Sequence, residues 1–307
     1  MEKYFTIGNF TISTDSCVDF FKSYLEKKNV YCITVKRILK GIKLGEIYDS
    51  SEEFDNFYYD LKKGALPTTS EISSFEMREY FENILAKEKT GDIIHVALSS
   101  GLSPTYNNAK IAAAELNKNQ LTDRKIYVVD SLVATGGMGQ LVDNLIKMRD
   151  SEIETEDAIK KIERLRDYQQ TWVIVSDLHH LKRGGRISGF AAAMGSLMHV
   201  KPIIVLSKKG KLVIENKIKG DRKAVEYVLD KVYELGASAR PDFNDNTVYF
   251  YYSSRSSIYD ELRQIFMERY PNVVIRESRI GPVIGTHVGC DCSAISFEGV
   301  KRLDIEG

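Results

Sequence analysis

Short apolar runs alternate with longer amphipathic segments along most of this 307-residue chain. Residues 92–98 (DIIHVAL) and 126–129 (IYVV) are mostly apolar and are followed by Ser or Asp, as expected for buried strands that end in turns. Residues 51–63 instead repeat apolar positions every three or four residues, which predicts a helix. This alternation predicts an α/β architecture.

The N-terminal half repeats a cycle of strand, hydroxyl-bearing turn and helix, which predicts a mostly parallel sheet flanked by helices. In such sheets, ligands bind beyond the carboxyl ends of the strands. The predicted strands are residues 10–14, 30–35, 92–98 and 126–129, and the predicted helices are 18–28, 51–63, 75–86 and 106–117.

A charged stretch at residues 150–157 indicates an exposed connection between two domains, which the chain length also favours. We place the domains at residues 1–152 and 153–307, the second a mixed α/β domain with a hairpin around residues 208–210. Its predicted strands are residues 171–176, 201–206, 211–214, 247–252, 273–276 and 294–297, and its predicted helices are 158–168, 190–199, 222–235 and 258–269.

Composition and motif content limit the classes of ligand, partner and cellular location to expect. Lys plus Arg and Asp plus Glu number 43 each, so no overall charge attracts nucleic acid or an anionic membrane. The four cysteines follow no zinc or disulfide spacing and indicate thiols in a reducing compartment. No signal peptide or membrane span is recognisable, and the expected location is the cytoplasm. Residues 136–139 (GGMG) lack the full dinucleotide fingerprint, and we expect neither a metal nor a cofactor.

Hydroxyl groups at two turns are candidate anion ligands. Ser99 and Ser100 follow a predicted strand and precede a helix, whose free N–H groups and dipole favour an anion. Thr69 and Ser70 also precede a predicted helix. Helix capping explains all four hydroxyls equally well, so each turn by itself leaves both interpretations open.

Two further motifs supply an imidazole and two guanidiniums. Thr286 and His287 lie between glycines that permit close approach of a ligand, although a structural histidine fits the same pattern. Arg183 and Arg186 bracket a Gly-Gly pair and could bind phosphate or an acidic partner, or form a solvated turn.

An apolar, small-residue segment at residues 190–198 offers material for a tunnel. Ala192, Met194 and Leu197 are the candidate lining residues, because small and flexible apolar side chains fit around a lipid. Ordinary core packing is the alternative interpretation.

Taken together, these motifs resemble those of the DegV family of bacterial fatty-acid-binding proteins, which includes the FakB subunits of fatty acid kinase. The resemblance spans nearly the whole chain and rests on the order and spacing of several motifs. They are residues 14–16 (TDS), 69–70 (TS), 98–106 (LSSGLSPTY), 129–131 (VDS), 181–188 (LKRGGRIS), 201–203 (KPI) and 281–287 (GPVIGTH).

The resemblance implies a two-domain α/β protein that buries a long-chain fatty acid between its domains. By motif position, the carboxylate would meet hydroxyls among Thr69, Ser70, Ser99, Ser100 and Thr286, with His287 close by. Arg183 and Arg186 would contact phosphate or a partner. It also implies a carrier without a catalytic nucleophile, which presents the acid to a separate ATP-dependent fatty acid kinase that makes the acyl phosphate.

The chain departs from the family pattern in three segments. Pro104 stands where the family usually has Gly, Glu71 and Ile72 replace a Gln-Pro-like pair, and residues 289–292 (GCDC) replace a Gly-Pro-Gly-like turn. Asp291 would repel a carboxylate if it pointed inward. Two alternative functions stay open, namely a Ser100/His287 hydrolase or acyltransferase and a stand-alone lipid sensor, although no Gly-x-Ser-x-Gly elbow is present.

Overall fold

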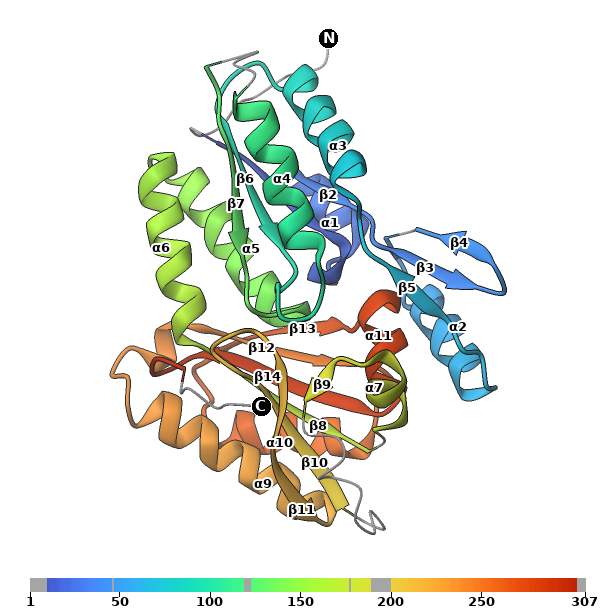
Figure 1. The fold of residues 1–307 in the computed structure, drawn as a ribbon. Helices are drawn as coiled ribbons and strands as arrows, with labels where there is room; N and C mark the ends of the chain where they lie inside the picture. The colour runs from blue at the N-terminus through green and yellow to red at the C-terminus, as the bar shows by residue number, and fades with distance from the viewer. Residues whose placement is uncertain (1–9, 46, 119–122, 177, 189–199, 303–307) are drawn as a thin grey trace.

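Two large sheets, each with its own helices, form the upper and lower halves of the computed structural model (Figure 1). It describes residues 10–45, 47–118, 123–176, 178–188 and 200–302. The predicted α/β class with two sheet-based halves is confirmed.

The N-terminal half is built on a four-stranded, entirely parallel sheet in the order β2-β1-β6-β7. Its strands are β1 Phe10–Asp15, β2 Val30–Ile33, β6 Asp92–Ala97 and β7 Ile126–Asp130. The surrounding helices are α1 Lys22–Lys27, α3 Ser74–Lys87, α4 Thr105–Lys118, α5 Thr135–Asp150 and α6 Thr155–Tyr168. Ala-rich α4 packs closely on α3 and β7, as expected from its small side chains.

The C-terminal half is built on a seven-stranded mixed sheet in the order β13-β12-β14-β8-β10-β11-β9. Its strands are β8 Gln169–Val175, β9 Ile187–Ser188, β10 Val200–Leu206, β11 Leu212–Lys219, β12 Thr247–Tyr252, β13 Val274–Arg279 and β14 Cys292–Glu298. The helices are α7 His179–Gly184, α9 Asp221–Val232, α10 Ser257–Arg269 and α11 Pro282–Val288. Strands β10 and β11 form the predicted hairpin.

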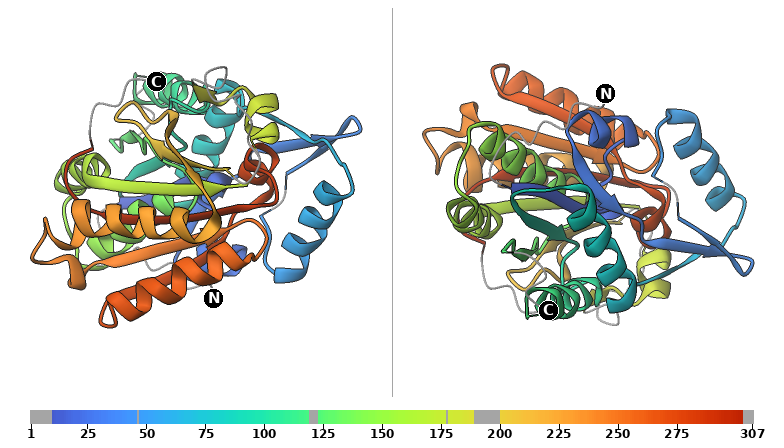
Figure 2. Two further views of the ribbon diagram at one scale, coloured as in Figure 1. Left: turned by 90° about the horizontal axis from the view of Figure 1, so that it is seen from below. Right: turned by 90° about the horizontal axis from the view of Figure 1, so that it is seen from above.

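Alternate residues of the central strands face opposite sides of this sheet. Trp172, Ile174 and Phe250 belong to the core beneath α9 and α10, which cover one face (Figure 2). Val175 and Tyr251 belong to a different apolar cluster on the other face, toward the N-terminal half. Because successive side chains of a strand point to opposite faces, the same strands can both form a core under the helices and line a site between the halves.

A small three-stranded sheet and helix α2 (Ser51–Lys62) project from one side of the molecule (Figure 1). The sheet has the order β4-β3-β5, with β3 at Lys36–Leu39, β4 at Ile42–Leu44 and β5 at Thr68–Ser70. The sequence predicted α2 but missed this sheet. The predicted cap at Thr69 and Ser70 is therefore wrong, because both residues lie in β5.

Helix α3 is capped by Ser73 instead. The Ser73 hydroxyl accepts the N–H of Glu76, whose carboxylate accepts the Ser73 N–H. This reciprocal pair satisfies two of the free N–H groups at the helix start. The predicted turn around Thr286 is also wrong, because α11 begins with Pro282 and continues through both Thr286 and His287. The predicted helix at residues 190–199 lies outside the described residues.

Glycines 136, 137 and 139 lie in α5, where they let the helix approach its neighbours. A Cβ at Gly136 would overlap the ring of Tyr251 on β12, and one at Gly139 would overlap Phe20. The GGMG segment thus serves helix packing at the junction between the halves. Among the described residues, no helix combines the length and the apolar character that a membrane span requires.

An ionic contact also joins the halves. The Asp143 carboxylate on α5 accepts hydrogen bonds from Tyr24, Tyr249 and Arg276. The buried face of α6, with Ala158 and Ile162, packs into the N-terminal core, while the C-terminal sheet begins only at β8. The division at residues 152 and 153 stays a prediction.

Candidate functional site between the two sheets

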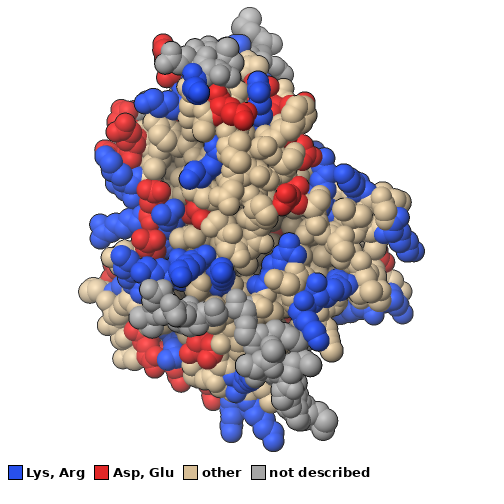
Figure 3. Space-filling model, in the orientation of Figure 1, with Lys and Arg blue, Asp and Glu red and all other residues tan. Residues whose placement is uncertain are grey.

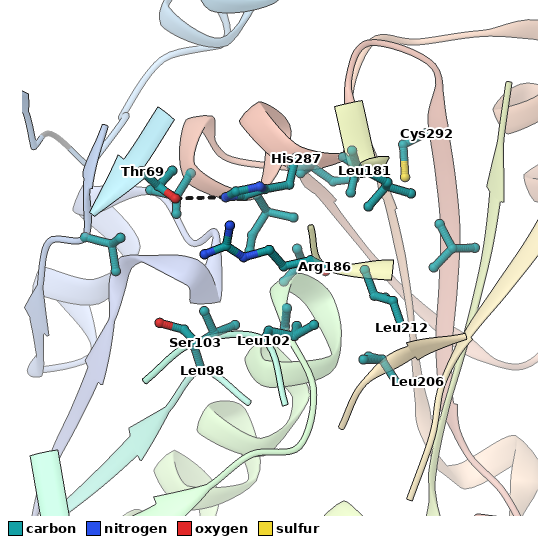
Figure 4. A pocket seen from close by; sticks show the side chains of 18 of the residues that line it. Thr69, Leu98, Leu102, Ser103, Leu181, Arg186, Leu206, Leu212, His287 and Cys292 are labelled. Carbon is teal, nitrogen blue, oxygen red and sulfur yellow. Dashed lines mark hydrogen bonds between the residues drawn. The ribbon is translucent and has the colours of Figure 1, made fainter. Parts of the chain in front are cut away.

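A cavity of about 370 Å³ lies between the two halves (Figure 4). Its walls combine side chains that follow the N-terminal parallel strands, side chains of β5 and the seven-stranded sheet, and side chains of α11. The apolar lining residues are Val35, Leu98, Leu102, Pro104, Ala134, Val173, Val175, Leu181, Ile204, Leu206, Leu212, Ile280, Val283, Ile284, Val288 and Cys292. The polar lining residues are Thr69, Ser70, Glu71, Ser103, Thr135, Thr171, Arg186, Tyr251 and His287. A mostly apolar cavity with a few converging polar groups is typical of a small-molecule site.

Thr69 and His287 meet at one end of the cavity. The Thr69 hydroxyl lies 2.8 Å from Nε2 of His287, a hydrogen bond that joins β5 to the last turn of α11 (Figure 4). Strand β5 is held in place by antiparallel pairing with β3, and Arg37 lies opposite Thr69. The structure therefore brings together two of the predicted site residues.

Burial keeps His287 neutral. Desolvation, with smaller contributions from Arg186 and Arg183, lowers the pKa of His287 to about 4. Its Nδ1 is buried without a hydrogen-bond partner among the described residues and faces Gly184, where a Cβ would overlap it. A bare acceptor costs less to bury than a bare N–H, so we assign the proton to Nε2. The Thr69 oxygen then accepts from His287, which leaves the Thr69 proton free to donate.

The two arginines of the Arg-Gly-Gly-Arg motif are separated in function. The Arg186 guanidinium lies between the Thr69–His287 pair and Ser103 (Figure 4). Because Arg186 is exposed, we place the mouth of the cavity beside it. Arg183 does not line the cavity, and its Nη2 donates to the carbonyl oxygens of Pro67 (3.3 Å) and Thr286 (3.4 Å). Arg183 thus holds β5 against α11, while Arg186 supplies a positive charge.

Ser103 is a lining residue that the sequence analysis did not select. Its hydroxyl lies 2.9 Å from that of Thr105, at the start of α4, and Pro104 beside it also faces the cavity. Ser70 and the exposed Glu71 complete the polar end. The Ser-Pro-Thr sequence at a helix start was the available signal for Ser103, because a serine there can cap the helix and still face a ligand.

Ser99, Ser100 and Thr286 are not among the lining residues. Ser99 is fully buried, and its hydroxyl donates to the Gly210 carbonyl oxygen at 2.8 Å, in the turn between β10 and β11. Ser100 is exposed, and its backbone N–H donates to Asp130. The Thr286 hydroxyl donates to the Pro282 carbonyl oxygen within α11. The hydroxyls of Ser99 and Thr286 and the backbone N–H of Ser100 thus hold the scaffold around the cavity.

The structure describes only some of the remaining residues that the sequence analysis placed near the site. Ala192, Met194 and Leu197 lie outside the described residues, so the predicted tunnel segment stays a prediction. Asp291 is exposed and does not line the cavity, whereas Cys292 does. Burial, followed by the charge of Asp291, raises the pKa of the Cys292 thiol to about 12, which keeps that wall uncharged. All four cysteines are free thiols.

No group of three or more His, Cys, Asp or Glu side chains in the described part of the chain is placed to hold a metal ion.

Residues 9–299 match the model of the family described as "Uncharacterised protein, DegV family COG1307". The chain belongs to the DegV family. The DegV domain-containing protein SPs1668 of Streptococcus pyogenes is 32% identical over 294 residues, which cover 94% of this chain and 98% of that protein.

Solved DegV structures share the whole architecture. DegV of Bacillus subtilis, described as a fatty acid binding protein, is 26% identical with a TM-score of 0.78, covering 95% of this chain and 99% of its own. The fatty acid kinase B3 protein of Streptococcus pneumoniae, solved with linoleic acid, is 17% identical with a TM-score of 0.78, covering 94% and 99%. The family and the fold agree with the resemblance seen in the sequence.

Proposed function

We propose that this DegV protein binds a long-chain fatty acid in the cavity and presents its carboxylate to a separate ATP-dependent kinase. The observation that carries the proposal is the polarity of the cavity, whose long apolar wall ends at the Thr69–His287 pair and Arg186. The B. subtilis and S. pneumoniae proteins, which share the fold, are described as fatty-acid-binding and as loaded with linoleic acid.

The polar end suits a carboxylate. A charged group leaving water must be hydrogen-bonded or paired. The Thr69 hydroxyl, oriented by neutral His287, would donate one hydrogen bond, and Ser70 and Ser103 offer further hydroxyls at the same end. Arg186 at the mouth would supply the opposite charge, partly offset by Glu71.

The apolar walls suit the acyl tail. Burial of each CH₂ group contributes about 0.8 kcal/mol, so an enclosed tail supplies most of the affinity, while the head group sets its orientation. The branched aliphatic side chains of β8, β10 and α11 provide this surface.

Presentation to a kinase is the second part of the proposal. With the carboxylate at the mouth, an incoming phosphoryl donor would reach it without unfolding the carrier. Lys and Arg side chains gather near the level where the two halves meet (Figure 3). Such charges would attract an acidic partner surface or nucleotide phosphates.

Native mass spectrometry of the purified protein, followed by denaturing extraction, tests the first part. A stoichiometric fatty acid supports the proposal, and a protein that is empty and refuses added fatty acids contradicts it. Incubation with ATP and a fatty acid kinase from the same cell tests the second part, with the acyl phosphate trapped as a hydroxamate. Binding without acyl phosphate would leave a lipid sensor, and ester turnover lost in Ser100→Ala would indicate a hydrolase.

A further inference from the structure

Four hydroxyl groups gather where β8, β12, β14 and the start of α5 meet beside the cavity. The Tyr251 hydroxyl and the Thr171 hydroxyl each lie 2.8 Å from the Ser296 hydroxyl. Thr135, at the start of α5, lies within hydrogen-bonding reach of the Tyr251 hydroxyl. None of the four residues is more than 5% exposed, and Thr135, Thr171 and Tyr251 line the cavity. We refer to these four residues as the hydroxyl cluster.

The strand register places the hydroxyl cluster away from the end of the wall that adjoins α11. On paired strands β8 and β14, Val175 lies opposite Cys292, Val173 opposite Ala294 and Thr171 opposite Ser296. Cys292 follows closely after α11, which carries His287, and Ser296 lies four residues farther along β14. At about 3.3 Å per residue, the strand runs ~13 Å from Cys292, next to α11, to Ser296 in the hydroxyl cluster.

Hydrogen-bond capacity within the cluster is incompletely used. Each Ser or Thr hydroxyl has one proton to donate and can accept two hydrogen bonds, and the Tyr hydroxyl donates one and accepts one. Four hydroxyls bonded only to one another have fewer protons than acceptor positions, so part of their acceptor capacity stays free. Burial raises the pKa of Tyr251 to about 12, so the cluster is uncharged at neutral pH. The basic lining residues, Arg186 and His287, belong to the other end.

These properties select the kind of group that the cluster can hold. A carboxylate is unsuited, because it needs donors or a cation and the cluster offers mainly acceptors. A plain methylene leaves the free hydroxyl capacity unused in an apolar cavity, at a cost in free energy. A hydroxyl group both donates and accepts, and so fits the free capacity.

We propose that the cavity is built for a long-chain fatty acid that carries a hydroxyl group in the middle of its chain, held by the cluster of Tyr251, Ser296, Thr171 and Thr135. This inference rests on the proposed fatty-acid function and specifies its substrate class. Thr135 adopts a left-handed backbone with φ of 51°, an uncommon conformation for a β-branched residue.

Binding of stearate, 2-hydroxystearate and 12-hydroxystearate to the delipidated full-length protein tests the inference. We expect 12-hydroxystearate to bind about two- to tenfold more tightly than stearate, as one added neutral hydrogen bond allows. We expect 2-hydroxystearate to show no such gain, because its hydroxyl stays beside the carboxylate. If stearate binds and 12-hydroxystearate binds no more tightly, the inference is overturned, whether or not water occupies the free hydrogen-bonding positions of the cluster. Failure of all three acids to bind contradicts the proposed function itself.

Variants then assign the preference to the cluster. Thr171→Val and Tyr251→Phe keep the shape of each side chain and remove its hydroxyl, so both should abolish the preference while stearate still binds. Ser293→Ala is the matched control, because Ser293 is also buried on β14 but three residues from Ser296, on the opposite face. A preference that survives in both cluster variants overturns the assignment. If a variant fails to fold, the comparison of the three acids on the wild-type protein decides.

Discussion

The Thr69 hydroxyl and Nε2 of His287 lie 2.8 Å apart, although 218 positions separate them in the chain. Thr69 comes from a strand beside the N-terminal half, and His287 comes from a helix of the C-terminal half. Neither half holds this pair by itself, so the head-group end of the cavity exists only when both halves are assembled.

Thr69→Val should weaken fatty-acid binding by about 1.5–3 kcal/mol, roughly 10- to 150-fold, because a hydrogen bond to a charged carboxylate is lost. Isothermal titration calorimetry with a long-chain fatty acid measures the change. Ser100→Ala is the control and should bind like wild type, because Ser100 is exposed and does not line the cavity. Equal affinity of wild type and a folded Thr69→Val variant would remove Thr69 from the proposed site.

His287→Ala should weaken binding by a similar amount, about 1.5–3 kcal/mol, because Thr69 loses the group that orients its hydroxyl. If His287 acts through Thr69, the double variant Thr69→Val/His287→Ala should lose less than the sum of the two single losses. A double-mutant cycle measured by fluorescent fatty-acid displacement checks this. Additive losses would mean that the two residues act independently.

Arg186→Gln should weaken binding by only about 1 kcal/mol, because charges at an exposed mouth are screened by solvent. The loss should shrink as the salt concentration rises, since ions screen the same interaction. Arg183→Gln should instead lower thermal stability, because Arg183 donates to Pro67 and Thr286 rather than facing the cavity. Measuring affinity at two salt concentrations and the melting temperature of each variant separates the two roles. A salt-independent loss in Arg186→Gln would exclude the charge interaction.

Acid should destabilise the protein partly through His287. Its pKa is lowered from 6.5 to about 4 in the folded state, so the unfolded chain binds the additional proton between these values. Stability is therefore retained above pH 6.5 and is lost progressively as the pH falls toward 4, by about 2 kcal/mol between pH 7 and pH 5. Urea unfolding of wild type and His287→Gln at both pH values checks this, and the variant should lose less. His95, whose pKa burial lowers to about 3, contributes in the same direction in both proteins.

Ser99→Ala should lower the free energy of unfolding by about 1–3 kcal/mol, because the buried Gly210 carbonyl loses its donor. Chemical denaturation measures this loss, and affinity for a fatty acid, corrected for the folded fraction, should stay unchanged. Selective loss of affinity in a stable Ser99→Ala protein would return Ser99 to the list of ligand contacts.

The sequence predicted the repeating strands and helices because their apolar periodicity is local. It missed the three-stranded sheet, since β3 places two basic residues before two apolar ones, and β4 is only three residues long with Ile42 exposed. Neither strand is long enough to show a clear alternation. It also assigned a turn to residues 285–287, because two glycines and a proline near one another usually interrupt a helix. Gly285 instead lies inside α11, where any Cβ would press on Phe57 and Tyr58, a contact that no local pattern reveals.

The candidate site residues could likewise be predicted only in part, because local sequence does not show which hydroxyls face the cavity. Hydroxyls that could bind an anion could equally bind the scaffold, and only the tertiary structure separates Thr69 from Ser99. The Ser99 hydroxyl donates to the carbonyl oxygen of Gly210, 111 positions away. The turn can approach Ser99 only because Gly210 lacks a side chain. The hydroxyl cluster was invisible for a related reason, because Thr171, Tyr251 and Ser296 meet only through strand pairing.

The cavity between the halves has a consequence for the energetics of the fold. Leu206, Val283 and Leu98 belong to the N-terminal apolar core and also line the cavity, so the core is continuous with the space that a tail would occupy. A bound chain would complete the packing that an empty cavity lacks. Under the proposed function, lipid and protein would then stabilise each other, and release of the lipid would loosen the packing between the two halves.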